Sequence, residues 1–101
     1  MKLRQQGNFG LTDTEMKDAY NIIRTKRNRM VLSLLVQSAK ESNASIAQYM
    51  ITSLLECKSY DLLICQGVPI NRNDFYVYRR LTLSIFYKKY KRLGANDHEE
   101  M

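Results

Sequence analysis

Hydrophobic residues recur along most of the chain at the three- and four-residue spacing of one helix face. A first stretch of this kind contains Met16, Ala19, Ile22 and Ile23. A denser apolar run follows at 30–36. Residues at this spacing form a continuous stripe along an α-helix, so both segments are predicted to be amphipathic helices. No Gly or Pro interrupts 13–41, which forms either one long helix or two helices meeting near Asn28; mean helix lengths favour two.

Polar residues at the ends of the apolar stretches predict the helix boundaries. Thr12 and Glu15 have the spacing of a capping box, so the first helix is expected to begin directly after Thr12. A polar connector at 41–45 separates the apolar run from another amphipathic helix that starts near Ile46. The segment 58–66 is predicted to be helical and to end at Gly67, although its four consecutive apolar residues are also compatible with a buried strand.

A turn between Gly67 and Asn71 precedes the last predicted helix. Pro69 disfavours helical backbone at the residue before it, and Asn71 is a good N-cap residue. The last helix can therefore run from Arg72 to Leu93, with Gly94 ending it. We expect an all-α fold, a small bundle of four to five helices. The expected organisation is a flexible arm at 1–10, one helical domain at 11–94 containing a helix-turn-helix at 54–93, and a disordered acidic tail at 95–101.

The amino-acid composition agrees with an all-α fold and also shows that the chain carries a net positive charge. Four Gly and one Pro are too few for the many turns of a β-sandwich or barrel. Sixteen Lys and Arg against ten Asp and Glu give a net charge of +6, which favours a polyanionic partner. Three of the ten acidic residues lie in the last five positions, so the rest of the chain is more basic than the total suggests. The positive charge concentrates in three blocks, at 24–29, 72–80 and 88–92.

The last predicted helix carries the clearest functional pattern. A helical projection places its core-facing stripe at Phe75, Tyr78, Thr82, Ile85 and Phe86. The same projection directs a second set of side chains outward from the first three turns. Arg pairs with guanine and Asn with adenine in the major groove, while Tyr and Arg also bind phosphates. With the N-cap residue included, the candidate DNA-binding residues are Asn71, Arg72, Asn73, Tyr76, Arg79 and Arg80. Candidate additional phosphate contacts are Arg24, Lys26, Arg27, Lys88 and Lys89.

The segment from Gly67 to Arg80, GVPINRNDFYVYRR, resembles the helix-turn-helix of region-4-like sigma-factor modules and of small phage-type transcriptional regulators. The resemblance covers about a third of the chain. It implies that the helix starting at Arg72 enters the major groove of double-stranded DNA. The chain departs from the pattern at Asp74, an acid in the first turn, which repels phosphate unless it serves as a cap.

Residues for other chemistries are sparse. The single histidine, His98, lies in the acidic tail, so no Ser or Cys nucleophile has a partner base, and we expect no enzyme activity. Cys57 and Cys65 match no zinc spacing and are expected to be buried free thiols, which indicates a cytoplasmic location. We expect no metal, no cofactor and no membrane partner. No apolar stretch approaches the length of a membrane span.

These observations predict a small DNA-binding transcriptional regulator of phage or mobile-element type. The run 30–36 is more apolar than one small helix needs, so a homodimer through it is a further expectation. The alternative is an interaction module that binds and modulates a host replication or transcription protein, using apolar residues such as Leu81, Leu83 and Tyr87. Single-stranded nucleic acid is a third, less favoured partner.

Overall fold

The computed structural model describes residues 9–56 and 58–100, with side chains through Leu93. In these residues the chain is helical and contains no strand, which confirms the predicted all-α class and excludes a strand at 58–66. The α-helices are α1 (Asp13–Thr25), α2 (Arg29–Asn43), α3 (Ala47–Glu56), α4 (Tyr60–Leu63) and α5 (Arg72–Glu100), and two short 3₁₀ turns, η2 (Ala44–Ile46) and η3 (Ile64–Gln66), connect them. The predicted arm 1–10 lies outside this description except for Phe9 and Gly10.

The first two helices begin at the caps that the sequence predicts. Thr12 accepts a hydrogen bond from the Glu15 backbone amide at 3.0 Å, and the Glu15 carboxylate accepts one from the Thr12 amide at 2.9 Å. The segment 13–41 forms two helices, and the side chain of Asn28 caps the second by accepting from the Val31 amide at 2.9 Å. These reciprocal bonds satisfy amides that have no partner within the helix.

The middle of the chain differs in detail from the expected connector. Helix α2 continues through 41–43, and Asn43 then caps η2 by accepting from the Ser45 amide at 3.0 Å. The segment 58–66 is a four-residue α4 followed by η3, not one regular helix. It ends at Gly67, as predicted, with a left-handed φ of 87°.

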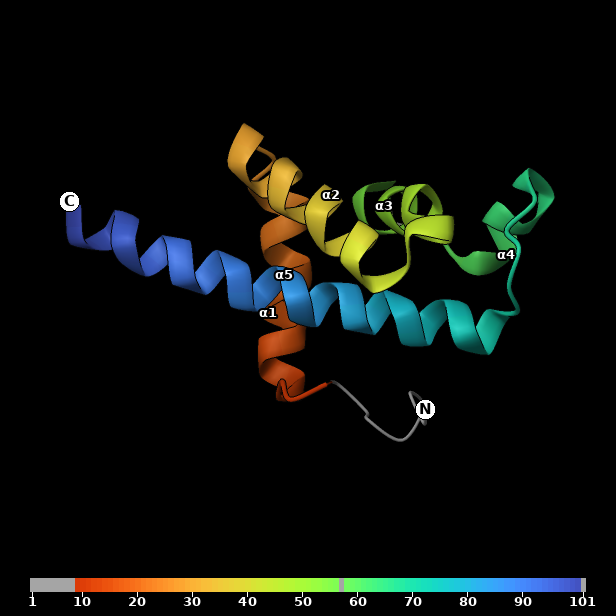
Figure 1. The fold of residues 1–101 in the computed structure, drawn as a ribbon, viewed down its shortest axis with the longest axis horizontal. Coiled ribbons are helices and arrows are strands. Elements are labelled where there is room, and N and C mark those ends of the chain that lie inside the picture. Colours follow the sequence, from red (N-terminus) through yellow and green to blue (C-terminus); the bar gives the residue numbers. More distant parts are fainter. Residues whose placement is uncertain (1–8, 57, 101) are drawn as a thin grey trace.

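Helix α5 runs along the length of the molecule and packs against α1, α2, α3 and α4. Figure 1 shows α1 crossing α5 near its middle, with α2 and α3 together on one side of α5 and α4 near its N-terminal end. The backbone stays helical beyond Gly94 to Glu100, so the predicted end at Leu93 is wrong. A glycine inside a helix costs only about 1 kcal/mol, which does not force a helix to stop.

Two clusters of buried side chains form the core. One joins α1, α2 and α3 to the middle of α5 around Ile23, Leu35 and Phe86. The other joins α2, α3 and α4 to the start of α5 around Met50, Leu63 and Phe75. The apolar run 30–36 is largely used within the chain itself, because Val31, Leu34 and Leu35 are buried in the first cluster and only Val36 among its apolar residues is exposed. This packing removes the reason for expecting a dimer through that run.

Candidate nucleic-acid interface

The predicted helix-turn-helix segment has a different local structure from the one we expected. Helix α3 ends at Glu56, so the segment before the turn is the short α4 and η3. The turn itself agrees with the sequence, since Asn71 accepts from the Asp74 amide at 2.9 Å and caps α5. The side-chain amide nitrogen of Asn71 also donates a hydrogen bond to the Asp74 carboxylate at 3.3 Å. Asp74 thus takes part in the cap.

Several of the candidate DNA-binding side chains are engaged within the protein. Arg72 forms an ion pair with Asp61 of α4. The hydroxyl of Tyr76 accepts a hydrogen bond from the Tyr60 backbone amide at 2.9 Å, and the Tyr76 ring packs edge-on against Phe75. Helix α4 therefore lies over the side of α5 that carries Arg72 and Tyr76, which we had expected to face outward.

The orientation of Arg79 differs most from the predicted outward one. Its Nη1 donates to the Ser53 hydroxyl at 3.1 Å, and its guanidinium carbon lies 5.2 Å from the ring centre of Tyr20 and 5.4 Å from that of Tyr76. The physical reason is its position in the helix. Arg79 follows the buried Phe75 by four residues, a spacing that places both side chains on the same side of α5.

The other two candidates on α5 make no hydrogen bond or ion pair within the described part of the chain. Asn73 is exposed and Arg80 is half-buried. The core stripe of α5 also differs from the projection: Phe75, Thr82 and Phe86 are buried as expected, whereas Tyr78 and Ile85 are only half-buried. Additional buried positions of the helix are Val77, Leu83, Ser84 and Tyr87.

The strongest concentration of unpaired positive charge lies where α1 meets α2. We call this surface the basic corner; it consists of Arg24, Lys26, Arg27 and Arg29, all exposed. No Asp or Glu occurs anywhere in 19–40. The ion pairs found among the described residues are Lys58–Glu56, Arg72–Asp61 and Lys89–Glu41, so none includes the corner.

The local structure adds to the positive potential of the basic corner. The N-terminal end of α2, which carries the positive end of the helix dipole, lies within it and has no acidic residue in its first turn. Arg24 lies 5.7 Å from the ring centre of Tyr20. Arg27 donates to the Leu55 carbonyl at the C-terminal end of α3. The corner is therefore attached to the same end of α3 that Arg79 approaches from α5.

The candidate phosphate contacts on the second half of α5 are already engaged. Lys88 donates to the Phe9 carbonyl at 3.2 Å, and Lys89 pairs with Glu41 at 3.0 Å. Phe9 also accepts from the Ser84 hydroxyl at 3.0 Å, so this carbonyl is held by two donors. Of the five candidate phosphate contacts, Arg24, Lys26 and Arg27 thus belong to the basic corner, and the two lysines of α5 do not.

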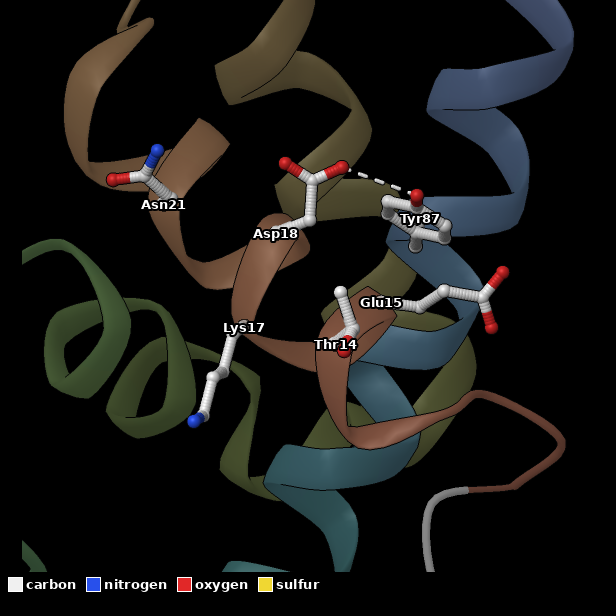
Figure 2. A pocket seen from close by; sticks show the side chains of 6 residues that line it. All are labelled: Thr14, Glu15, Lys17, Asp18, Asn21 and Tyr87. Atoms are coloured by element: carbon white, nitrogen blue, oxygen red, sulfur yellow. Dashed lines mark hydrogen bonds between the residues drawn. The ribbon is translucent and has the colours of Figure 1, made fainter.

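An open crevice between α1 and α5 has a different character (Figure 2). Its residues on α1 include Glu15, Asp18 and Asn21, and Tyr87 comes from α5. The Asp18 carboxylate points toward the Tyr87 hydroxyl, which donates to it at 3.1 Å. Burial raises the pKa of Tyr87, and the hydrogen bond to Asp18 raises it further. Its two carboxylates outnumber its one cation, Lys17, so this crevice is a poorer site for a polyanion than the basic corner.

Comparisons with family models, with curated proteins and with solved structures gave no match. The described residues contain no group of three or more His, Cys, Asp or Glu that could hold a metal ion. Within the same part of the chain, no helix combines the length and the apolar character needed to cross a bilayer. Cys65 is exposed, which corrects the expected buried thiol, while Cys57 and the side chain of His98 lie outside the description.

Two residues near the basic corner were not singled out by the sequence. Tyr20 precedes Arg24 by four residues, and this spacing could have indicated a ring–cation contact on one helix face. Ser53 carried no such signal, because its contact with Arg79 joins residues far apart in the chain. The apolar residues expected to bind a protein partner are also corrected: Leu83 and Tyr87 are buried and Leu81 is half-buried.

Proposed function

We propose that the protein binds double-stranded DNA and contacts the phosphate backbone with the basic corner. The observation that carries this proposal is the charge of the corner: four exposed cations where the end of α1 meets the start of α2, in a stretch of chain without an acidic residue. Cations and helix N-termini are the groups that proteins use against DNA phosphates. A small helical regulator of transcription is the function class that this activity fits.

Base reading, if α5 enters the major groove, would depend on fewer residues than the sequence suggested. Arg72 and Tyr76 use their polar groups within the protein, and Arg79 is turned toward Ser53, which leaves Asn73 and Arg80 for contacts to base edges. Two such side chains distinguish between DNA sequences less well than six, since each good bidentate pair between a side chain and a base contributes about 1–3 kcal/mol of discrimination against the wrong base. We therefore propose a DNA-binding mode in which phosphate contacts dominate the affinity.

A charge-matched pair of variants tests this proposal. Lys26→Gln with Arg29→Gln removes two exposed cations from the basic corner, and neither side chain has a hydrogen bond or ion pair in the described structure. Lys17→Gln with Lys40→Gln removes two exposed cations elsewhere. Both variants have the same net charge, so any difference between them reports the position of the charge and not its total.

The measurement is the dissociation constant for a labelled duplex as a function of salt. Each phosphate contact contributes about 0.9 to the slope of log affinity against log salt. We expect the corner variant to lose about 2 from this slope and the control variant to keep the parent slope. Equal slopes for the two variants, or a parent protein whose binding does not depend on salt, would show that the corner does not bind DNA.

A second candidate function is supported by a separate surface. Leu62 is 60% exposed and Ile64 is 50% exposed, and both lie on α4 and η3. Large apolar side chains exposed at nearby positions of one segment are a feature of protein-interaction sites. Binding of a protein partner there would resist salt and would weaken in Leu62→Ser with Ile64→Ser. A pull-down with and without nuclease, carried out with this variant and with the parent, distinguishes the two functions. An association mediated by DNA is lost with nuclease for both proteins, whereas a direct protein partner stays bound to the parent and is lost from the variant.

A further inference from the structure

Arg79 is a half-buried cation without a carboxylate partner in the described part of the chain. A guanidinium has five N–H donors, and one contact, from Nη1 to the Ser53 hydroxyl, is made here. No fully buried side-chain nitrogen or oxygen among the described residues lacks a hydrogen-bond partner. The remaining Arg79 nitrogens are therefore not fully buried. They are donors without a hydrogen-bond partner in the described part of the chain.

The surrounding contacts hold Arg79 in place before any ligand arrives. Ser53, which accepts from Arg79, donates its own hydroxyl proton to the Lys58 carbonyl at 2.6 Å, so its lone pair is directed at the guanidinium. The rings of Tyr20 and Tyr76 lie beside the guanidinium, and Tyr76 is held by the Tyr60 amide. A preorganised side chain loses less conformational entropy when it binds a ligand.

A second guanidinium lies beside the same aromatic ring. Arg24 and Arg79 approach Tyr20 with their guanidinium carbons at 5.7 Å and 5.2 Å from the ring centre. Two like charges repel each other, and neither is neutralised by an ion pair in the described structure. An anion bound beside either guanidinium would reduce this repulsion. The ring contacts also suit arginine in particular, since its planar guanidinium stacks on aromatic faces.

We infer that Arg79 and Arg24, arranged around Tyr20, form a binding site for a phosphoryl group. Guanidinium groups bind phosphate oxygens through two parallel N–H···O bonds, which makes a phosphoryl group the anion that this pair fits. The inference deepens the proposed function and rests on it for the source of that group, a DNA backbone phosphate. A free phosphate or a mononucleotide presents the same chemistry, so the experiment below separates these sources.

The test is an NMR titration of the whole chain with inorganic phosphate at constant ionic strength, following the arginine Nε–Hε signals. We expect saturable shifts at Arg79 and Arg24, and no saturable shift at Arg92, an exposed arginine of α5 without a hydrogen bond or ion pair in the described structure. Arg79→Lys keeps the charge but loses the planar donor pair, so it should weaken phosphate binding by about tenfold, whereas Arg92→Lys should not. Unsaturable or equal shifts at all three arginines in the parent would overturn the inference, even if Arg79→Lys fails to fold.

Two further arms identify the source of the phosphoryl group. A duplex without terminal phosphates should shift the Arg79 and Arg24 signals at lower concentration than a mononucleotide, because the basic corner adds further contacts only for DNA. Tighter binding of the mononucleotide would overturn the assignment to DNA backbone phosphate. If the corner variant loses its salt slope while Arg79 does not respond to the duplex, the proposed function stands and this inference fails. If Arg79 responds to phosphate but no duplex binds, the proposed function fails.

Discussion

The hydroxyl of Tyr87 on α5 donates a hydrogen bond to Oδ2 of Asp18 on α1 across 3.1 Å. Tyr87 is only 8% exposed and belongs to the core cluster around Ile23, Leu35 and Phe86. Its burial favours the neutral phenol, and a neighbouring carboxylate disfavours the phenolate further, so both raise the pKa of Tyr87 above its ordinary value of 10. The contact joins two helices that are far apart in the sequence.

This contact makes the stability of the protein sensitive to alkaline pH. Since the folded pKa of Tyr87 exceeds the unfolded one, its contribution is fully present below about pH 10 and is lost as the pH rises through the folded pKa. Tyr87→Phe should cost about 0.5–1.5 kcal/mol at neutral pH and should remove this part of the alkaline decline. Melting temperatures of parent and variant between about pH 8 and pH 11 test it; parallel declines above pH 10 would contradict the assignment.

Truncation of the two neighbouring leucines in α4 should have very different effects on stability. Leu63 is fully buried in the cluster around Phe75, whereas Leu62 is 60% exposed. Leu63→Ala should lower the free energy of unfolding by about 2–5 kcal/mol, because it removes buried methyl groups and leaves a cavity. Leu62→Ala should change it by less than about 0.5 kcal/mol. Urea denaturation of both variants provides the measurement, and similar losses would mean that α4 is packed differently.

Substitutions at Gly67 test the left-handed backbone conformation of the turn. Its φ is 87°, and a Cβ built at this position meets no other atom within 4 Å. Gly67→Ala should therefore cost about 1–2 kcal/mol from backbone strain without any steric clash. Gly67→Asn should cost less, since asparagine visits left-handed conformations more readily. Thermal denaturation of both variants compares these costs, and an alanine variant as stable as the parent would be evidence against the left-handed turn.

Substitution of Arg79 should lower the stability of the protein, whereas substitution of its neighbour Arg80 should remove only a surface charge. Arg79→Ala removes the hydrogen bond to Ser53 and the contacts with two rings, so we expect a loss of about 1–2 kcal/mol. Arg80→Ala removes one cation without a hydrogen bond or ion pair in the described structure and should stay within about 0.5 kcal/mol of the parent. Chemical denaturation measures both. Equal stability of the two variants would show that Arg79 is not held by the protein.

The sequence was sufficient where local chemistry decides the structure. Thr12, Glu15 and Asn28 act on backbone amides within three residues, so their spacing predicted two helix starts correctly. The left-handed Gly67 and the cap at Asn71 were predicted for the same reason. A glycine allows a helix to end but does not require it to, and at Gly94 the prediction of a helix end was wrong.

The candidate site depended on contacts that a helical projection does not contain. A projection shows which side chains of α5 share a direction, but not which neighbouring helix occupies that direction. Arg72 and Tyr76 face α4, and Arg79 faces Tyr20 and Ser53. The basic block that includes Arg24 was visible as a run of charge, but its proximity to Arg79 depends on α1 and α5 meeting at Tyr20.

The position of α5 in the chain has a consequence for folding during synthesis. Helices α1, α2, α3 and α4 all pack against α5, and all four precede it in the sequence. Both clusters of buried side chains also include residues of α5. A nascent chain that has not yet released α5 from the ribosome therefore leaves the apolar residues of both clusters without their α5 partners and open to chaperones and to aggregation. Closure of the core is a late event, and it completes both clusters together.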